Sequence, residues 1–399
     1  MRILHTGDWH IGRSLFGVPL LEAQEHFLAW LADLVTERRV DAVLVAGDVY
    51  DRALPGVEAV QALEAGLEAL SRRAPVVMIP GNHDSAQRLG FGAGWFTDRL
   101  RIRARVSQVA EPVVIPDADG GPGLWVYAVP YLDPDLAGPA VAAFGGDPGA
   151  DLPRSHEAVM RTVTDAIRDD LARRRGPVAP GEPRPAAVLT AHAFVGGGTA
   201  SESERDIRVG GVDVIPSEVF AGFDYVALGH LHGPQAVGTP DGTIRYAGSP
   251  LAFSFSERDH TKSVAVVDFD AQGRCADVEV VPTPVPRRLS DVTGTLEEVL
   301  SLRFASQRDD WTRITVRGAA RPDNLLATLR GVFPHVLEHH FEPLAAATTA
   351  RAGVGRDLVD PVSVAGEFVR QATGAPPTPA ETTVLNEAYA LARAREGGR

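Results

Sequence analysis

Residues 41–48, Asp41-Ala42-Val43-Leu44-Val45-Ala46-Gly47-Asp48, predict a buried β-strand that ends in a polar turn. A short, continuous apolar run of this kind is typical of a central strand in a parallel sheet. Similar strands are predicted at residues 2–6 and 75–79, and helical periodicity separates the three strands at residues 21–38 and 57–70. The N-terminal part therefore predicts a βαβαβ order with parallel pairing.

The middle of the chain predicts a second set of strands. They are expected at residues 124–128, 187–191, 225–228, 243–247 and 264–269, with a helix over about 155–175. Short turns join most of these strands, which favours a second sheet packed on the first. We therefore expect an α/β fold, a four-layer sandwich of two packed β-sheets flanked by helices.

The C-terminal third predicts smaller pieces. Alternating prolines at 282–286 are typical of a stiff spacer, so we expect the main domain to span residues 1–281. A small α+β segment is expected at 287–345, with its clearest strand at 313–316 and its clearest helix at 322–332. A linker at 346–360 and a helical tail at 361–399 follow. The apolar positions of the two tail helices are Val364, Phe368 and Val369 in one, and Val384, Leu385, Ala388, Tyr389 and Leu391 in the other.

Composition indicates a globular protein that works inside the cell. The chain has 399 residues, of which 44% are hydrophobic and 23% charged, and this length favours two or three domains. We expect no signal peptide at residues 1–10 and no membrane span, because no apolar run approaches about 20 residues. Cys275 is the single cysteine, so no internal disulfide forms. A cytoplasmic location is the expectation.

Charge leaves the choice of substrate open. The net charge of −13 is unusual for a nucleic-acid enzyme, but bound metal dications would reverse the local potential at a phosphate site. Lys262 is the only lysine and Thr261 precedes it, so the chain has no Gly-Lys-Ser/Thr phosphate loop. If ATP is involved, a partner must hydrolyse it.

Metal-binding side chains follow five of the predicted strands. They occur in the segments Asp8-Trp9-His10, Gly47-Asp48, Gly81-Asn82-His83-Asp84, His192 and Gly229-His230-Leu231-His232. Ligands bind where the carboxyl ends of parallel strands meet. Carboxylate, amide and imidazole donors without a thiolate suit hard or borderline divalent metals. The set is large enough for two ions that share one carboxylate, which is the core of a two-metal phosphoesterase.

The ordered combination is more specific than any one segment. A lone histidine after a strand is more often structural, and a Gly-Asp pair is more often a turn. Together, however, Asp8 and His10 can turn toward one ion, and Asp48 can bridge two ions. Asn82 offers a neutral oxygen, which limits the negative charge near an anionic substrate.

These segments resemble the calcineurin-like metallophosphoesterase superfamily, and additional segments resemble the bacterial SbcD family, the nuclease subunit of the SbcCD DNA-repair complex. The resemblance covers nearly the whole chain. It is carried by Leu4–Gly12, Gly47–Asp51, His192–Gly197, Ser203-Glu204-Arg205 and Tyr246-Ala247-Gly248-Ser249-Pro250. The phosphoesterase motifs occur in many hydrolases, whereas the additional segments, the small α+β segment and the helical tail favour SbcD.

The resemblance implies a role for each polar residue. One ion would be held by Asp8, His10, Asp48 and His232, and the other by Asp48, Asn82, His192 and His230. Manganese is the metal that the family prefers, although Zn²⁺ or Fe²⁺ also fits these donors. His83 would protonate the leaving 3′ oxygen or stabilise the transition state, with Asp84 orienting its ring. The alternative for His83 is a structural role beside the ligands, and Asp51 either supports the ligands or caps a helix.

The resemblance also implies partners. Residues 287–345 would be a capping domain that helps to orient duplex ends, although its eight arginines are balanced by eight acidic residues. The tail would dock onto the coiled coil of an SbcC-type ATPase. The family works as a homodimer within a heterotetramer. Residues 194–211 either line the DNA path or form a surface loop, and we expect Trp95 and Phe96 to pack in the core rather than stack on bases.

The sequence therefore predicts a two-metal DNA nuclease that acts on duplex ends, hairpins and single strands. Its 3′→5′ exonuclease and hairpin endonuclease activities are implied by the resemblance alone. Two alternatives share parts of the pattern. A stand-alone phosphodiesterase for small nucleotides has the same metal motifs but does not explain the C-terminal segments. A non-catalytic scaffold for DNA ends has no need for the full ligand set.

Overall fold

The computed structural model describes residues 1–344 except 97–98, 118, 122, 146–151, 177–181, 205–213 and 239–242, and, in the C-terminal part, residues 362, 365–366, 369–370 and 375–396. The chain divides into two compact units, Met1–Glu342 and Pro343–Arg399. The expected linker at 346–360 lies outside the described residues. The domain boundaries expected from the sequence stay predictions.

The first sheet contains the predicted βαβαβ order. Its strands run in the order β14 (Cys275–Pro282), β13 (Ser263–Phe269), β1 (Arg2–Thr6), β4 (Ala42–Ala46), β5 (Val76–Ile79) and β6 (Leu100–Ile102). The last four are parallel, and β13 pairs antiparallel with both β1 and β14. Helices α1 (Leu21–Glu37) and α2 (Val57–Ser71) supply the crossovers that parallel strands need. Phe27 and Leu31 of α1 share a buried cluster with Leu63 of α2 and Val43 of β4, which fixes both helices on one face.

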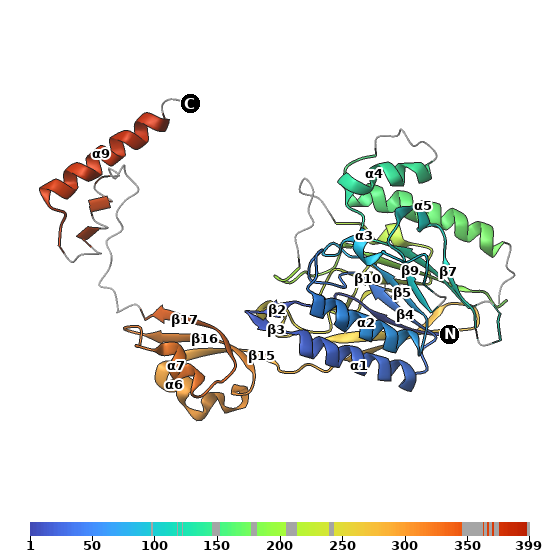
Figure 1. Cartoon of the computed structure of the whole chain (residues 1–399), viewed down its shortest axis with the longest axis horizontal. Coiled ribbons are helices and arrows are strands. Elements are labelled where there is room, and N and C mark those ends of the chain that lie inside the picture. Colours follow the sequence, from blue (N-terminus) through green and yellow to red (C-terminus); the bar gives the residue numbers. More distant parts are fainter. Residues whose placement is uncertain are drawn as a thin grey trace. The chain divides into compact units, whose positions relative to one another are not determined.

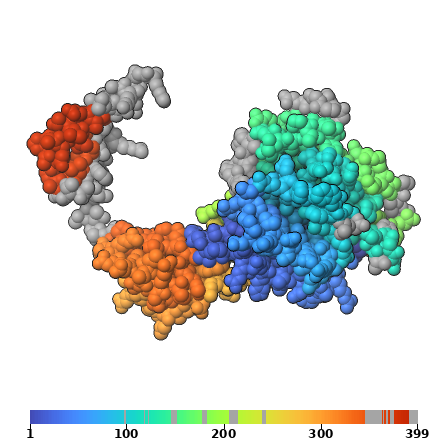
Figure 2. Space-filling view, in the orientation of Figure 1, coloured from blue at the N-terminus to red at the C-terminus, as the bar shows by residue number. Residues whose placement is uncertain are grey.

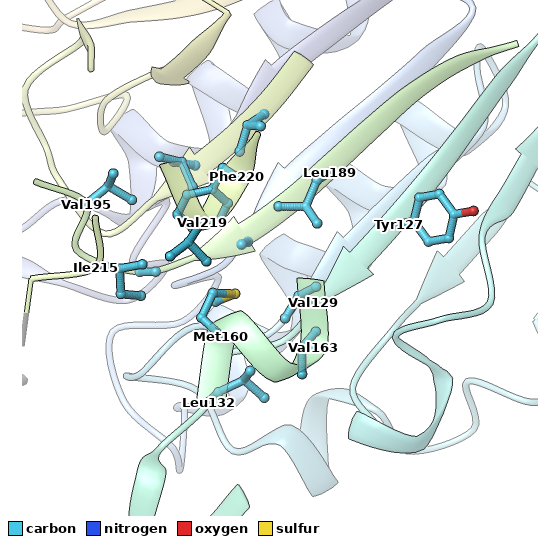
Figure 3. Packing of buried hydrophobic residues seen from close by; sticks show 14 of the residues in the cluster. Tyr127, Val129, Leu132, Met160, Val163, Leu189, Val195, Ile215, Val219 and Phe220 are labelled. Carbon is cyan, nitrogen blue, oxygen red and sulfur yellow. The ribbon is translucent and has the colours of Figure 1, made fainter. Parts of the chain in front are cut away.

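The second sheet is also mostly parallel. Its strands run in the order β11 (Gln235–Ala236), β12 (Ile244–Tyr246), β10 (Tyr225–Gly229), β9 (Ala186–His192), β8 (Leu124–Val129) and β7 (Val113–Ile115). Helices α4 (Pro134–Ala142) and α5 (His156–Arg175) pack on its outer face. Figure 3 shows Met160 and Val163 of α5 close to Val129 and Leu189 of the sheet, all members of one buried cluster.

The two sheets pack face to face. The inward side chains of both sheets form a third buried cluster, which includes Leu44 and Ile79 from the first sheet and Val126, Val188 and Ala227 from the second. In Figure 1, α1 and α2 lie on one side of the strands and α4 and α5 on the other. This is the four-layer α/β sandwich that the sequence predicts, so the fold class is confirmed.

Shorter elements connect the layers. They are the hairpin β2 (Ser14–Leu15) and β3 (Val18–Pro19), the single-turn helix α3 (Ala86–Leu89), and the 3₁₀ turns η1 (Val106–Gln108), η2 (Ala143–Gly145), η3 (Ser217–Phe220) and η4 (Phe255–Glu257).

A three-stranded sheet follows the sandwich. Its order is β15 (Leu289–Thr295), β16 (Trp311–Gly318) and β17 (Val336–Pro343), with α6 (Leu296–Leu300), η5 (Leu302–Gln307) and α7 (Leu325–Arg330) beside it. It has a small core of its own that includes Val292, Ile314 and Phe333. The expected strand at 313–316 lies within β16, whereas α7 is shorter than the helix expected at 322–332. Leu289 joins a buried cluster with Leu15 and Leu20 of the sandwich. In Figure 2 the orange surface of this part of the chain meets the dark blue surface of the N-terminal part.

The C-terminal unit contains helix α9 (Pro379–Glu396), which covers the second of the two expected tail helices. Val364 and Phe368 of the first expected tail helix lie outside the described residues. Within the part of the chain that the structure describes, no helix combines the length and the apolar character that a membrane span requires.

Candidate metal centre

All seven predicted ligands lie at carboxyl ends of parallel strands, and the face-to-face packing of the two sheets brings them together. The first sheet contributes Asp8 and His10 after β1, Asp48 after β4 and Asn82 after β5; the second contributes His192 at the end of β9 and His230 and His232 after β10. Every one except the half-buried Asn82 is buried. The cluster therefore exists only because two separate sheets end at the same place.

The backbone is strained where these ligands leave their strands. Asp8, His10 and Asp48 have φ angles of 52°, 45° and 46°, and His230 has a φ of 110°. Residues other than glycine rarely adopt positive φ, and each such residue costs about 1–3 kcal/mol unless its surroundings enforce it. Two hydrogen bonds of 2.9 Å, from Asp8 N to Gly47 O and from His10 N to Asp48 O, tie the two loops together. Strain of this kind concentrates at functional sites.

Gln24 of α1 holds the first loop in place. Its side-chain Nε2 donates to the carbonyl oxygens of Trp9 and His10, at 3.1 and 2.8 Å, and its Oε1 accepts from Gly12 N at 2.9 Å. The sequence offered little signal for this role, because a glutamine on an amphipathic helix is usually exposed. Its position on the buried face of α1 is the one clue.

One group of ligand atoms comes from Asp8, His10 and His232, which all lie within 4.8 Å of one another. The Nε2 atoms of His10 and His232 are 3.1 Å apart. Burial, followed by the neighbouring histidines and Arg13, lowers the pKa of His10 well below its usual value, so the ring stays neutral. Neutral imidazole and ionised carboxylate are the forms that bind metals. The phenyl ring of Phe253 packs edge-on against both histidines, with centroid distances of 5.1 and 5.3 Å.

A second group comes from Asn82, His192 and His230. The Oδ1 atom of Asn82 lies 2.8 Å from His192 Nε2 and 3.3 Å from His230 Nδ1. His192 Nδ1 donates to the carbonyl oxygen of Ala46 at 2.9 Å, because a carbonyl can only accept. Its Nε2 is then the nitrogen with a free lone pair, and this atom faces the cluster.

Asp48 lies between the two groups. Its Oδ2 is 3.6 Å from His10 Nε2 and 3.5 Å from His192 Nε2, while its Oδ1 accepts from His83 N at 2.8 Å. Burial and then the Asp48 charge raise the pKa of Asp8 well above its usual value. Asp8 and Asp48 are two buried carboxylates in one cluster, and such a pair is stable in the ionised form only beside cations. The donors therefore fit two divalent ions that share Asp48.

His83 is buried at the edge of the cluster, and its partner differs from the one we expected. Its Nδ1 donates to the carbonyl oxygen of Asp51 at 2.7 Å, which leaves Nε2 4.0 Å from Asp48 Oδ2. Asp84, expected to orient this ring, instead accepts backbone N–H groups of Val49, Tyr50 and Gly81 at 2.9–3.0 Å. The carboxylate lies between the loop after β4, which supplies Val49 N and Tyr50 N, and the turn after β5, which supplies Gly81 N.

Asp84 thus supports the site with a carboxylate that holds backbone N–H groups, and Asp51 contributes both its carbonyl oxygen and its carboxylate. Burial and the neighbouring Asp48 carboxylate raise the pKa of Asp84 to about 7, and bound cations would oppose that shift. The carboxylate of Asp51 lies 3.9 Å from His10 Nδ1 and 3.7 Å from Arg13. Of the two roles considered for Asp51, support of the ligands fits these contacts.

A groove of about 1080 Å³ opens beside the second group. Asn82 and Asp84 lie in its lining, together with Arg101, Arg103 and Arg105. Trp95 also lines it and is 80% exposed, so the prediction that Trp95 packs in the core is wrong. Phe96 does pack against the core cluster of the first sheet. Trp95 and Phe96 are both aromatic, so residue type alone did not predict that Trp95 faces outward and Phe96 packs inward.

Comparisons with known proteins identify the family. The sequence model of the calcineurin-like phosphoesterase family matches residues 1–234. Similar solved structures include a 5′-nucleotidase precursor from Thermus thermophilus, at 17% identity and a TM-score of 0.36, which covers 71% of this chain and 54% of that one. Another is a dimetal phosphatase from Danio rerio, at 10% identity and a TM-score of 0.38, which covers 71% of this chain and 99% of that one.

The match spans about half the length of the Thermus protein. The family match, by contrast, covers more than half of this chain and contains Asp8, His10, Asp48, Asn82, His192, His230 and His232. The chain therefore belongs to the calcineurin-like phosphoesterase family.

Proposed function

We propose that this phosphoesterase is a metal-dependent DNA nuclease of the SbcD type. It would act as a 3′→5′ exonuclease on duplex ends and as an endonuclease on hairpins and single strands. The groove beside the metal cluster is the observation that carries this proposal. Its volume of about 1080 Å³ lies at the top of the roughly 300–1,000 Å³ range of pockets that hold small molecules, and three arginines line it. Arginine suits the phosphates of a nucleic-acid strand.

The residues at the cluster divide the chemistry among them. When bound, two divalent ions, for which we propose Mn²⁺, supply positive charge for the phosphate and make water more acidic. Asp8, His10, Asp48 and His232 would hold one ion, and Asp48, Asn82, His192 and His230 the other. The chain's own residues orient these ligands and bury all of them except the half-buried Asn82.

His83 is positioned to move a proton. Its Nδ1 is engaged by Asp51 O, so its Nε2 is the atom that faces the cluster. With both nitrogens protonated, Nε2 can deliver a proton to the leaving 3′ oxygen as the phosphodiester bond breaks. Because Asp84 ties Gly81, in the turn before His83, to Val49 and Tyr50 in the loop after β4, it is a positioning residue in this scheme.

We further propose an SbcC-type ATPase as partner and a homodimer within a heterotetramer, in the cytoplasm on the nucleoid. Val384 of α9 is 63% exposed, as expected for a helix that docks into a partner's groove. Leu54, Val57 and Phe91 are 68%, 74% and 75% exposed, which supplies apolar surface for a second copy. Light scattering of the chain, alone and with the ATPase, measures both assemblies; a monomer in both samples would contradict them.

The test is Mn²⁺-dependent cleavage of an end-labelled DNA hairpin by the wild type and by His83→Ala, with and without the ATPase. We expect cleavage by the wild type and a loss of about 10²–10⁴-fold in the variant, which still holds two metals. His26→Ala removes an exposed histidine of α1 and serves as the matched control, with wild-type activity expected.

Two results would contradict the proposal, and a third would revise its mechanism. Hydrolysis of cyclic nucleotides with no cleavage of DNA, in protein shown to hold two metals, would favour a small-nucleotide phosphodiesterase. DNA binding by protein that holds no metal would favour the scaffold. Metal-replete His83→Ala protein with wild-type cleavage would leave the nuclease function intact but remove His83 from the mechanism.

A further inference from the structure

The single lysine of this chain is buried beside the metal cluster, and the proposed chemistry does not use it. Lys262 is 4% exposed. Its Nζ donates to three acceptors: the carboxylate of Glu257, the carbonyl oxygen of His232 at 3.0 Å and the Oγ of Ser249 at 2.9 Å. All three ammonium protons therefore have a partner, and one partner is the backbone of a predicted ligand.

Glu257 connects this lysine to the imidazole of the same ligand. Its Oε2 accepts from Lys262, and its Oε1 accepts from the Oγ of Ser203 and from Phe253 N at 3.2 Å. The same Oε1 lies 3.5 Å from His232 Nδ1. Glu257 is 1% exposed, so this carboxylate has exchanged its water for protein donors.

Ser203 completes the connection. Its Oγ is 2.6 Å from His232 Nδ1. The neighbouring Glu204 accepts from His232 N at 2.8 Å, and its other oxygen accepts from Ser201 N and Ser201 Oγ. Ser203 and Glu204, two residues of the Ser-Glu-Arg segment noted in the sequence, thus hold the ring and the backbone of His232. The adjacent Arg205 lies outside the described residues.

The direction of each hydrogen bond follows from what each group can do. An ammonium only donates and a carboxylate only accepts, so Ser203 Oγ must donate its one proton to Glu257. The same oxygen must then accept from His232, which places the proton on Nδ1. His232 Nε2 is left with its lone pair, and this atom faces His10 Nε2 in the first group of ligands.

We propose that Lys262, Glu257 and Ser203 form a positioning relay that holds His232 in the Nδ1–H tautomer and thereby sets the affinity of the metal ion shared by Asp8, His10 and His232. The inference rests on the two-metal site, and not on the identity of the substrate. Hydrogen-bonded partners behind a histidine ligand typically change metal affinity about 10–100-fold. The second group of ligands, around His192, has Ala46 O in the corresponding place and should be unaffected.

The first experiment compares Ser203→Ala with Ser203→Thr. Calorimetric titration of metal-free protein with Mn²⁺ should show two sites in the wild type. In Ser203→Ala one site should weaken by about 10–100-fold and the other should not, while Ser203→Thr, which keeps the hydroxyl, should restore most of the loss. Ser290→Ala is the matched control, because Ser290 also donates to a carboxylate, Asp310 at 2.6 Å, in the three-stranded sheet.

A second readout tests the tautomer directly. In ¹⁵N-histidine spectra of the metal-free wild type, the His232 signals, identified by their loss in His232→Gln, should show a protonated Nδ1. Ser203→Ala should shift this population toward Nε2–H. Glu257→Gln, checked for folding by circular dichroism, should do the same, because an amide can donate to Ser203 and reverse the relay.

The inference is overturned if Ser203→Ala binds both ions with wild-type affinity. It is also overturned if, in both Ser203→Ala and Ser203→Thr, the two metal sites lose affinity to the same extent. An unchanged His232 tautomer in folded Ser203→Ala would overturn it too. None of these measurements uses DNA, so they are decided independently of whether the protein cleaves it.

Discussion

Three histidines at the metal cluster are oriented by a hydrogen bond from the ring nitrogen that faces away from it. His192 Nδ1 donates to Ala46 O, His83 Nδ1 to Asp51 O, and His232 Nδ1 to Ser203 Oγ. In each ring that bond orients the opposite nitrogen toward the ligands. Backbone carbonyl oxygens accept the hydrogen bond from His192 and His83. A substitution of a neighbouring side chain should therefore leave these two rings in place.

His5 shows what the same side chain does without a metal. It lies on β1 with Nδ1 3.0 Å from Tyr225 Oη and Nε2 3.1 Å from Leu228 O, both in the second sheet. Burial lowers the pKa of His5 from 6.5 to about 3, against the opposing effect of the Leu228 carbonyl. A neutral His5 therefore bridges the two sheets.

This shift predicts a pH-dependent stability. The unfolded chain takes up a proton on His5 below pH 6.5, whereas the folded chain does not until about pH 3. The stabilisation is complete above pH 6.5 and is lost as the pH falls toward 3, by about 1.4 kcal/mol per pH unit. Urea unfolding of metal-free protein at pH 7 and pH 5 measures it. His5→Gln, which cannot take up a proton, should reduce this dependence by about 1.4 kcal/mol per pH unit, while buried His10 keeps a dependence of the same sign. His26→Gln should leave the slope as in the wild type; equal slopes in all three proteins would contradict the assignment.

Among the elements, the turns that end β1, β4, β5 and β10 matter most for the site. Four candidate ligands in these turns have positive φ angles: Asp8, His10, Asp48 and His230. The glycines in the turns have no side chain, which lets neighbouring turns approach closely. Gly47 has a φ of 89°, and a Cβ atom there would lie 2.5 Å from His192 Nδ1. The close approach of the two sheets at the cluster therefore requires glycine at this turn.

Gly47→Ala tests this requirement against a matched turn. Gly17, in the β2–β3 hairpin, has a similar φ of 83° but nothing within 4 Å of an added Cβ. Gly17→Ala should cost only the backbone penalty of about 1–2 kcal/mol in unfolding free energy. Gly47→Ala should cost about 1–3 kcal/mol more from overpacking and should weaken Mn²⁺ binding through His192. Chemical denaturation and metal titration measure both, and similar losses in the two variants would rule out the steric role.

At the scale of the whole molecule, the metal cluster ties two sheets that are far apart in sequence. Asp8 and Asp48 come from the first sheet, and His192 and His230 from the second, more than 140 residues further along the chain. An unfolded chain cannot present these donors together, so metal binding should stabilise the folded state alone.

Metal removal should therefore lower stability by an amount that depends on concentration. At a free Mn²⁺ concentration 100 times the Kd, each site should add about 2.7 kcal/mol to the unfolding free energy relative to protein in EDTA. Thermal unfolding with and without Mn²⁺ checks this. Asp48→Asn, which removes the shared carboxylate, should lose most of the effect; an undiminished shift in that variant would place the stabilising ions elsewhere.

Local sequence patterns were enough to predict the sandwich and the strand ends at which the candidate ligands lie. The strands expected at 41–46, 75–79 and 225–228 agree to within a residue with Ala42–Ala46, Val76–Ile79 and Tyr225–Gly229. A buried parallel strand is apolar on both faces, so its signal is contained in the strand itself. Its carboxyl end is then the place for ligands, whatever the partner strand.

Contacts between distant segments settled what these patterns leave open. The edge strand β14 and the strands β15 and β17 gave no comparable signal, because half-exposed strands are defined by the neighbour they pair with. Gln24, Ser203, Glu257 and Lys262 are ordinary polar residues in the sequence, and only folding gives each of them its partners. Hydrogen-bond direction, burial and backbone strain depend on groups brought together from both sheets, so they follow from packing and not from any one stretch of chain.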